Sequence, residues 1–266
     1  MNVVVASFSL PITHRRPFLR TLRQELLQRY AGSVGGWLWY VIAPLLFLVF
    51  YASIYLMIFK IKPANITPQI YVLYIFSGLI SFLAFSEGLS SATNSLAQNR
   101  SILLNAVFPI ELLPIRSALA SHISAIAGFG IACLVSAGLG LASPAMLLLP
   151  VILFLQVTFL AGIACFLAPL ALILKDIPEI IRFVTMLLLV ISPIAYFPSE
   201  ASSTVQLLVK MNPLAHFIIA YQQILVFSQF PELSFLLVMV LISFSCYVLG
   251  FAFISKIKPI VGEYAI

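Results

Sequence analysis

Charged residues are scarce in this sequence. Asp, Glu, Lys and Arg make up 8% of it, whereas about a quarter of a typical soluble domain is charged. Hydrophobic residues account for 62%, and the mean hydropathy is +1.14. This composition excludes an ordinary soluble domain and predicts an all-α integral membrane protein. Because the connectors between apolar segments are too short to hold a soluble domain, residues 1–266 are expected to form one transmembrane domain.

Cysteines are also few. Cys133, Cys165 and Cys246 lie in apolar runs without paired spacing, so neither a disulfide framework nor a metal site is expected. The N-terminal residues lack a basic segment before their short apolar run, which is not the pattern of a signal peptide.

Catalytic and energy-coupling motifs are missing. The sequence contains no HExxH, no paired aspartates, no Ser-Lys dyad and no GxxxxGK[ST] phosphate loop. Ionisable residues near the apolar runs fall at the expected cytoplasmic ends, which leaves the middle of the membrane uncharged and argues against ion-coupled transport. We therefore expect no enzymatic activity and no cofactor in this chain. Any uphill transport would draw its energy from another subunit.

A few polar residues close to the apolar runs leave alternatives open. His122 and His216 are interpreted as hydrogen-bonded structural residues rather than ligands. Glu87 is either a gate, a partner of Arg116, or a carboxylate at the membrane interface.

Six apolar runs are long enough, or nearly so, for transmembrane helices, which need about 20 residues. They cover residues 37–59, 70–90, 118–139, 145–173, 181–196 and 233–254. With the N-terminus inside, only Lys60, Lys62 and Lys210 of the 14 Lys and Arg residues lie outside. Since basic residues collect on cytoplasmic loops, both termini are predicted to be cytoplasmic.

Residues 14–30, before the first run, have the pattern of a basic amphipathic helix. Apolar residues recur at steps of four, and arginines fall mostly elsewhere on the helix. Such a helix suits the cytoplasmic membrane interface, with a simple orientation signal as the alternative. The following AGSVGG allows the chain to turn into the first span, because glycine costs little at bends.

Residues 197–232 form the longest predicted outside segment. Its apolar pieces, 205–211 and 214–226, are broken at Asn212-Pro213 and are too short to cross a bilayer. Because backbone at membrane depth must be buried in protein or face a water-filled cavity, a re-entrant helical hairpin is predicted. The alternative is a surface loop on the headgroups.

Two cytoplasmic connectors, residues 94–116 and 174–182, offer a surface for a partner. In the first, residues 94–108 are expected to contain a short helix ended by Pro109, with Asn99 and Arg100 exposed. A short amphipathic helix in a partner's groove is a known recognition mode, and a solvated hairpin loop is the alternative.

Aromatic residues recur at helical steps in the first two spans. Sugar rings have apolar faces that pack on aromatic planes, so these stripes are candidates to line a glycan path, with packing or lipid contact as the alternative. The residues are Tyr40, Phe47, Tyr51 and Tyr55 in the first span and Tyr71, Tyr74, Phe82 and Phe85 in the second.

Several motifs, taken in order, resemble one family: the membrane subunits of type-2 ABC exporters of lipid-linked polysaccharides such as O-antigen, capsule and teichoic acid. The motifs are RYAGSVGGWLWYVIAPLL (29–46), LLNAVFPIELLPIRS (103–117), LKDIPEI (174–180), SPIAYFP (192–198) and NPLAHFI (212–218). Ala31 and Gly32 depart from the pattern, because relatives often carry another polar or basic residue there.

The resemblance implies a homodimer of six-span subunits with two separate ATPase subunits in a bacterial cytoplasmic (inner) membrane. It assigns residues 94–108 as the coupling helix region, with Asn99, Arg100, Ile102 and Leu103 as the ATPase contacts. It also implies that an undecaprenyl-linked glycan passes through a channel at the dimer interface, while Arg20, Arg23 and Arg29 meet the lipid pyrophosphate. Alternatives are export of teichoic acid, capsule, a drug or a small lipid, and a scaffold that transports nothing. No nucleic-acid partner is expected.

Overall fold

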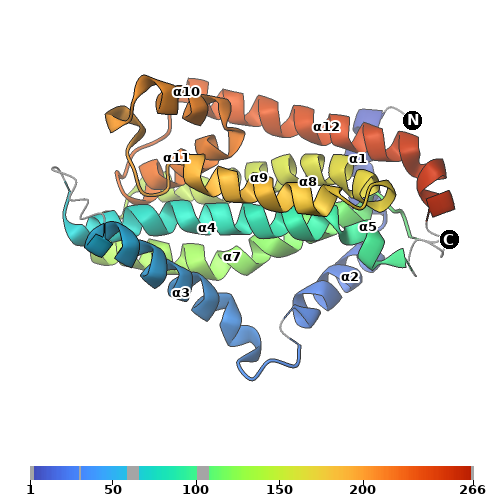
Figure 1. The fold of residues 1–266 in the computed structure, drawn as a ribbon, viewed down its shortest axis with the longest axis horizontal. Helices are drawn as coiled ribbons and strands as arrows, with labels where there is room; N and C mark the ends of the chain where they lie inside the picture. The colour runs from blue at the N-terminus through green and yellow to red at the C-terminus, as the bar shows by residue number, and fades with distance from the viewer. Residues whose placement is uncertain (1–2, 30, 59–65, 101–107, 265–266) are drawn as a thin grey trace.

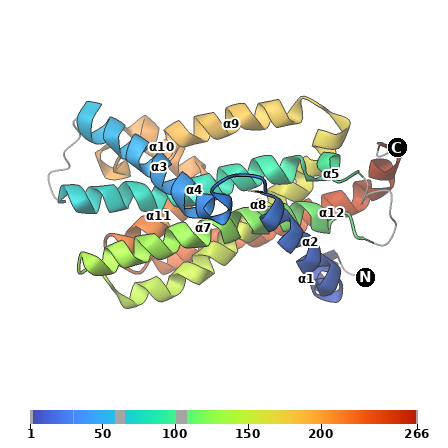
Figure 2. The same ribbon diagram turned by 90° about the horizontal axis from the view of Figure 1, so that it is seen from below.

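The computed structural model describes residues 3–29, 31–58, 66–100 and 108–264. Within these ranges every regular element is a helix, as the composition predicts (Figures 1 and 2). The α-helices are α1 (Val3–Thr13), α2 (Arg15–Gln28), α3 (Trp39–Ser53), α4 (Pro68–Thr93), α5 (Ser95–Gln98), α7 (Leu112–Gly138), α8 (Leu149–Ile173), α9 (Ile177–Ile191), α10 (Ser203–Met211), α11 (Pro213–Leu225) and α12 (Leu233–Tyr264).

Within the described part of the chain, four helical segments are long and apolar enough to cross a membrane: Pro68–Thr93, Leu112–Gly138, Pro144–Ile173 and Leu233–Val261. They correspond to the second, third, fourth and sixth of the predicted spans, which supports a multi-pass membrane protein. The third of them begins in a 3-10 helix, Pro144–Leu148, that leads into α8.

The first and fifth predicted spans correspond to shorter helices. Both α3 and α9 have 15 residues, or about 22 Å at 1.5 Å per residue, less than the roughly 30 Å of the hydrocarbon core. α3 continues into a π-helix, Ile54–Ile58, and residue 59 lies outside the described ranges. The predicted end of the fifth span at residue 196 is wrong, because α9 stops at Ile191. Ser192, which precedes Pro193, is extended, as residues before proline usually are. A six-span topology therefore stays a prediction.

α4 is the central helix of the bundle (Figures 1 and 2). In its most apolar 18-residue stretch 78% is buried, against 33% in α12. It packs on α7, α8 and α11. Gly88 permits this contact, because a Cβ there would lie 2.3 Å from Ser121 Oγ of α7 and 2.5 Å from a methyl group of Leu160 in α8. α12 lies at the edge of the bundle, and the face of α12 that does not pack on other helices is exposed.

A pair of glycines brings α8 and α12 together. A Cβ on Gly250 would lie 2.0 Å from the carbonyl oxygen of Gly162, and one on Gly162 would lie 2.4 Å from the backbone of Cys246. Small residues allow such close helix contacts inside membranes, where no hydrophobic effect drives association.

The first and last helices pack on each other. α1, a helix that the sequence reasoning missed, packs on α12, and the Tyr247 hydroxyl donates a 2.8 Å hydrogen bond to the Ser7 carbonyl. Both termini are at the same end of the bundle, while α10 and α11 are toward the opposite end (Figure 1). Assignment of the terminal end to the cytoplasm stays a prediction.

α10 and α11 match the two helical pieces predicted in residues 197–232. The chain breaks at Asn212, whose side-chain oxygen accepts a 3.0 Å hydrogen bond from the Leu214 N–H and so caps α11 ahead of Pro213. The two helical pieces are thus present, and a re-entrant hairpin in the membrane stays a prediction.

Candidate functional site

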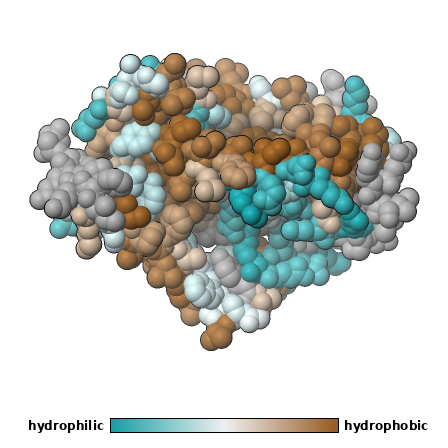
Figure 3. Space-filling view, in the orientation of Figure 1, coloured by the Kyte–Doolittle hydropathy of each residue, from teal (hydrophilic) through white to brown (hydrophobic). Residues whose placement is uncertain are grey.

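α2 lies within residues 14–30, where the sequence predicts an amphipathic helix before the first span. Phe18 and Leu22 are buried, and the helix packs on α7, whereas Arg20 and Arg23 are exposed. Hydrophilic residues gather over the region of α2 and α5, whereas much of the rest of this face is apolar (Figure 3). The two arginines are thus placed for contact with charged groups outside the protein, and their predicted contact with lipid headgroups stays a prediction.

A glycine-containing turn connects α2 to α3. Gly32 and Gly36 have φ values of +82° and +47°, the left-handed region that glycine occupies without the penalty other residues meet. The hydroxyl of Tyr40 in α3 donates a 2.6 Å hydrogen bond to the Leu26 carbonyl in α2, which ties the two helices together across the turn. The predicted turn is present, and Ala31 and Gly32, the departures from the family pattern, are part of it.

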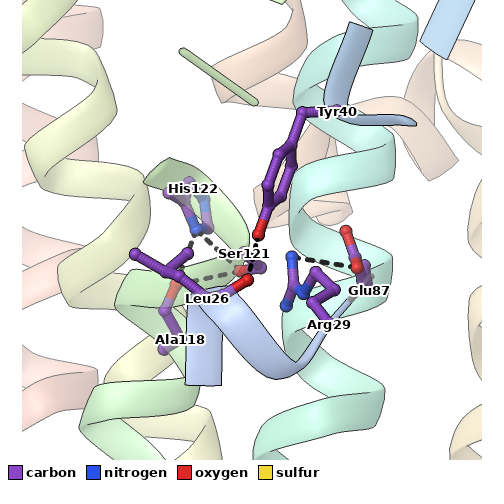
Figure 4. Close-up of polar contacts among 7 residues, drawn as sticks. All are labelled: Leu26, Arg29, Tyr40, Glu87, Ala118, Ser121 and His122. Carbon is purple, nitrogen blue, oxygen red and sulfur yellow. Dashed lines mark hydrogen bonds and ion pairs between the residues drawn. The ribbon is translucent and has the colours of Figure 1, made fainter. Parts of the chain in front are cut away.

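An ion pair joins α2 to the central helix. Arg29 Nη1, just after α2, lies 2.9 Å from Glu87 Oε1 in α4, with side-chain exposures of 12% and 47%. Tyr40 lies beside this pair (Figure 4). Since each charge neutralises the other, Arg29 differs from the exposed Arg20 and Arg23, and any contact it makes with a lipid phosphate would compete with Glu87.

Arg116 of α7 has a different carboxylate partner. Its Nε lies 2.6 Å from Glu25 Oε2 of α2, and its Nη2 donates a 3.4 Å hydrogen bond to Asn99 Oδ1. The alternative that pairs Glu87 with Arg116 is therefore wrong, because Glu87 pairs with Arg29, just after α2, and Arg116 pairs with Glu25.

A third interhelical ion pair lies at this end of the bundle. Lys258 Nζ of α12 is 3.1 Å from Oε1 of the buried Glu111, which precedes α7. Among the described residues these three pairs link α2 and α12 to the α4–α7 core. Partly buried ion pairs need their partners, because an unpaired charge there would be costly.

Two cavities flank the Arg29–Glu87 pair. One, of about 280 Å³, is mostly apolar and is lined by α3, α4 and α7 with Glu87 among its residues. The other, of about 440 Å³, is polar and lies between α2, α7 and the end of α4, with Arg29 among its residues. Their residues include Tyr40, Pro44, Phe47, Ile80 and Leu83 in the apolar cavity and Gln24, Gln28, Ser91, Gln98 and Arg116 in the polar one. An apolar cavity close to a polar one suits an amphipathic ligand.

Both histidines have structural hydrogen bonds. His122 Nδ1 lies 2.9 Å from the Ala118 carbonyl and 3.2 Å from Ser121 Oγ (Figure 4). His216 Nδ1 lies 3.1 Å from the Asn212 carbonyl, and its ring stacks on Phe235. These contacts confirm the structural interpretation of both residues.

The aromatic residues predicted on one face of the first span do share a face. Phe47 stacks on Tyr51 at a centroid distance of 6.2 Å, and Tyr51 lies 5.1 Å from Tyr55. Phe47 is exposed, and Tyr40, Tyr51 and Tyr55 are partly buried. A role in lining a channel stays a prediction.

The aromatic residues of the second span lie inside the protomer. Tyr71, Tyr74, Phe82 and Phe85 are all buried. The Tyr71 hydroxyl donates to the Ala195 carbonyl at 2.6 Å, and that of Tyr74 to the Tyr196 carbonyl at 3.0 Å. These contacts within the protomer favour packing, the alternative that the sequence left open, and the Tyr74 ring also borders a cavity.

The predicted ATPase contacts are only partly described. Arg100 is exposed, as predicted, whereas Asn99 is partly buried beside Arg116, so its predicted exposure is wrong. Ile102 and Leu103 lie outside the described residues. The described helix here, α5, is four residues long.

Sequence reasoning missed the group of polar residues that holds the turn after α9. Gln222 Nε2 of α11 donates a 2.9 Å hydrogen bond to the Pro193 carbonyl, and Asn212 Nδ2 donates to Ser192 Oγ at 3.0 Å. Gly78 makes room, because a Cβ there would lie 2.9 Å from Gln222 Nε2. The two adjacent glutamines, Gln222 and Gln223, within a mostly apolar helix were the available signal.

Comparison with known proteins places these features in context. No protein-family model matches the chain. It is similar to an O-antigen export system permease protein RfbA of Klebsiella pneumoniae, 26% identical over 240 residues, which cover 88% of this chain and 89% of the relative. A protein of the same name from Myxococcus xanthus is 22% identical over 237 residues, 86% and 88% of the two chains. A further one from Klebsiella pneumoniae is 25% identical over 206 residues, 76% of each. These similarities confirm the resemblance to polysaccharide export permeases.

Proposed function

We propose, on the premise that this chain resembles O-antigen export permeases along most of its length, that it is the membrane subunit of an ATP-driven ABC exporter. Its substrate would be a lipid-linked polysaccharide, with O-antigen the first candidate. The similarity over 88% of the chain to a relative of nearly equal extent is the observation that carries this proposal. It concerns most of the helical bundle rather than one motif.

The energy source would be a separate ATPase. The chain has no phosphate loop, so nucleotide and Mg would bind to the partner. Two copies of each subunit would assemble in a bacterial inner membrane with the shared end of α1 and α12 in the cytoplasm. Arg100 and the rest of residues 94–108 would contact the ATPase and transmit its closure to α4 and α7.

The second copy would lie against α9. This helix leaves most of its apolar side chains exposed in the protomer and buries only Ile181. The exposed ones are Ile180, Phe183, Val184, Met186, Leu187 and Val190. In a membrane, such a large exposed apolar face is covered by lipid or by another subunit. A channel between two copies would place α3 and α9 along the path of the glycan.

The junction of α2, α3 and α4 would receive the lipid-linked end of the substrate. Its apolar cavity would take part of the isoprenoid chain, and the arginines of α2 would meet the pyrophosphate. An anion approaching Arg29 would weaken the Arg29–Glu87 pair, because both anions compete for one guanidinium. Release of that pair would free α2 to move about the glycine turn.

Reconstitution tests this proposal. The chain and a partner ATPase would be placed in proteoliposomes, and ATP hydrolysis would be measured with and without undecaprenyl-linked glycan. We expect the glycan to stimulate hydrolysis and to accumulate on the far side of the membrane. A variant in the predicted ATPase contact, Arg100→Glu, should keep membrane insertion and lose coupled export. Transport by the chain alone, driven by an ion gradient, would refute the proposal.

A further inference from the structure

A further cavity lies beside the turn that follows α9, apart from the cavities at the junction of α2, α3 and α4. Its volume is about 320 Å³, and it is bounded by α4, residues 197–199 and the C-terminal part of α11 with the turn beyond it. This is at the small end of the range of ligand pockets, about 300–1,000 Å³. One ring-sized group fits such a space better than a polymer or a lipid does.

Aromatic rings form one part of this cavity. Phe197 lies 4.6 Å from Tyr74, and Phe227 lies 6.2 Å from Tyr74 in an edge-on arrangement, as measured between ring centroids. Because Phe227 is 38% exposed, part of its ring is accessible to a ligand.

Amide groups form the other part. Gln222, Gln223 and Gln229 line the cavity. Gln222 uses its nitrogen on the Pro193 carbonyl, whereas the buried Oε1 of Gln223 has no hydrogen-bond partner among the described residues, and Gln229 is exposed. Each amide can both donate and accept, which is the complement of a hydroxyl group.

The backbone holds these groups in place. Ser228, between Phe227 and Gln229, has a φ of +56°, which is uncommon for a residue other than glycine. Its hydroxyl donates a 2.6 Å hydrogen bond to the Leu141 carbonyl, and the Gln229 N–H donates to the Gln223 carbonyl at 3.0 Å. Unusual backbone that is fixed by several contacts is often found at binding sites.

The chemistry of the lining selects among ligand classes. Of the described residues that line the cavity none is charged, so a phosphate or an ionic peptide would find no counter-charge. An acyl chain would leave the glutamine amides without partners, which is costly. A neutral sugar ring meets both demands, because its apolar face packs on aromatic rings while its hydroxyls exchange hydrogen bonds with amides.

We propose that the cavity formed by Tyr74, Phe197, Phe227, Gln222, Gln223 and Gln229 is a binding subsite for one neutral sugar residue of the exported glycan. This proposal rests on the proposed function, because the sugar residue belongs to the glycan that the protein would export. The subsite lies toward the end of the bundle opposite to the chain termini and is separate from the junction that would hold the lipid carrier.

The test is glycan binding in the absence of ATP. The chain with its ATPase partner would be placed in nanodiscs and titrated with neutral oligosaccharides released by mild acid from the surface polysaccharide of the source cells, with saturation-transfer NMR as the readout. We expect binding about tenfold weaker in Phe227→Ala and in Gln229→Leu, roughly the loss of one good contact. Phe230→Ala is the matched control, because Phe230 is in the same turn, is 61% exposed and does not line the cavity.

Two further variants separate stacking from folding. Phe227→Tyr should bind like the unaltered protein, because it keeps an aromatic face, whereas Phe227→Leu should bind as weakly as Phe227→Ala. Equal binding by all variants, absence of binding, or equal binding of an uncharged capped Ser-Gly peptide would overturn the subsite. ATP-driven export with no binding at this cavity would refute the subsite alone, whereas binding without ATP-driven export would refute the proposed function and leave the subsite.

Discussion

Arg29, at the end of the amphipathic helix α2, lies 2.9 Å from Glu87 of the central helix α4. The contact joins the segment expected at the membrane surface to the most buried of the four long apolar helices. We therefore expect a change in the position of α2 to displace or strain α4. The same helix bears Tyr71 and Tyr74, whose hydroxyls donate hydrogen bonds to the turn after α9.

Breaking this ion pair is expected to destabilise the protein. Glu87→Gln removes the negative charge that lies beside the largely buried Arg29, and because Glu87 is 47% exposed the cost should be about 1–2 kcal/mol, between the values of surface and buried pairs. The midpoint of thermal unfolding in detergent measures it. Arg182→Gln is the matched control, since its pair with Glu179 is exposed at 72% and 60% and should contribute about 0–0.5 kcal/mol. Equal shifts for both variants would contradict the prediction.

The contact between α8 and α12 should not tolerate a larger residue. Gly250→Val places atoms where the Gly162 carbonyl oxygen now lies, so the helices must separate, at a cost of about 1–3 kcal/mol or more. The yield of monodisperse protein and its unfolding temperature report this. Gly130→Val in α7 is the control, because a Cβ there meets nothing within 4 Å. A Gly250→Val protein as stable as the control would show that the helices do not approach so closely.

The exposed arginines of α2 should make activity depend on anionic lipid. Arg20 and Arg23 face outward, and each basic residue near an anionic surface contributes about 1 kcal/mol. In Arg20→Gln/Arg23→Gln we expect export to respond less to the fraction of phosphatidylglycerol in proteoliposomes, with a shift of about one order of magnitude in the lipid fraction needed. Lys210→Gln, an exposed change at the opposite end of the bundle, should leave the lipid dependence unaltered. An unchanged lipid response in the double variant would exclude a headgroup role.

Gln222 should be needed for the position of the turn after α9. Gln222→Leu removes the donor to the Pro193 carbonyl and leaves that oxygen buried without this partner, at a cost of about 1–3 kcal/mol. Faster amide hydrogen exchange at residues 194–197 would show the loss of order, with thermal unfolding as a second measure. Gln28→Leu, an exposed site in α2, is the control for the change in side-chain type. Unaltered exchange would mean that Tyr71 and Tyr74 hold the turn without Gln222.

The features that the sequence predicts well are those set by local pattern. Apolar runs longer than 20 residues became α4, α7, α8 and α12, and the break at Asn212-Pro213 separated α10 from α11, because proline and a capping side chain act within a few residues. α2 could be predicted for the same reason, because its apolar residues recur with the helical period and its arginines fall mostly elsewhere on the helix.

Contacts between distant segments were harder to predict. The partner of Glu87 depends on where α2 docks, and Arg29 and Arg116 have the same charge, so nothing in the sequence separates them. Likewise, the stripe of Tyr71, Tyr74, Phe82 and Phe85 has the same period whether it faces a channel or the interior of the protomer. The central position of α4, which decides this, follows from packing on three other helices.

The hydrogen bond from Tyr247 to Ser7 has a practical consequence for labelling. Since α1 is fastened to α12 and both ends of the chain are at one end of the bundle, fluorescent or enzymatic reporters fused to either terminus should sample the same compartment. A short peptide that joins the two termini would also cross no membrane, so circular permutation with the new ends in another loop is a feasible way to move the tag to the opposite face.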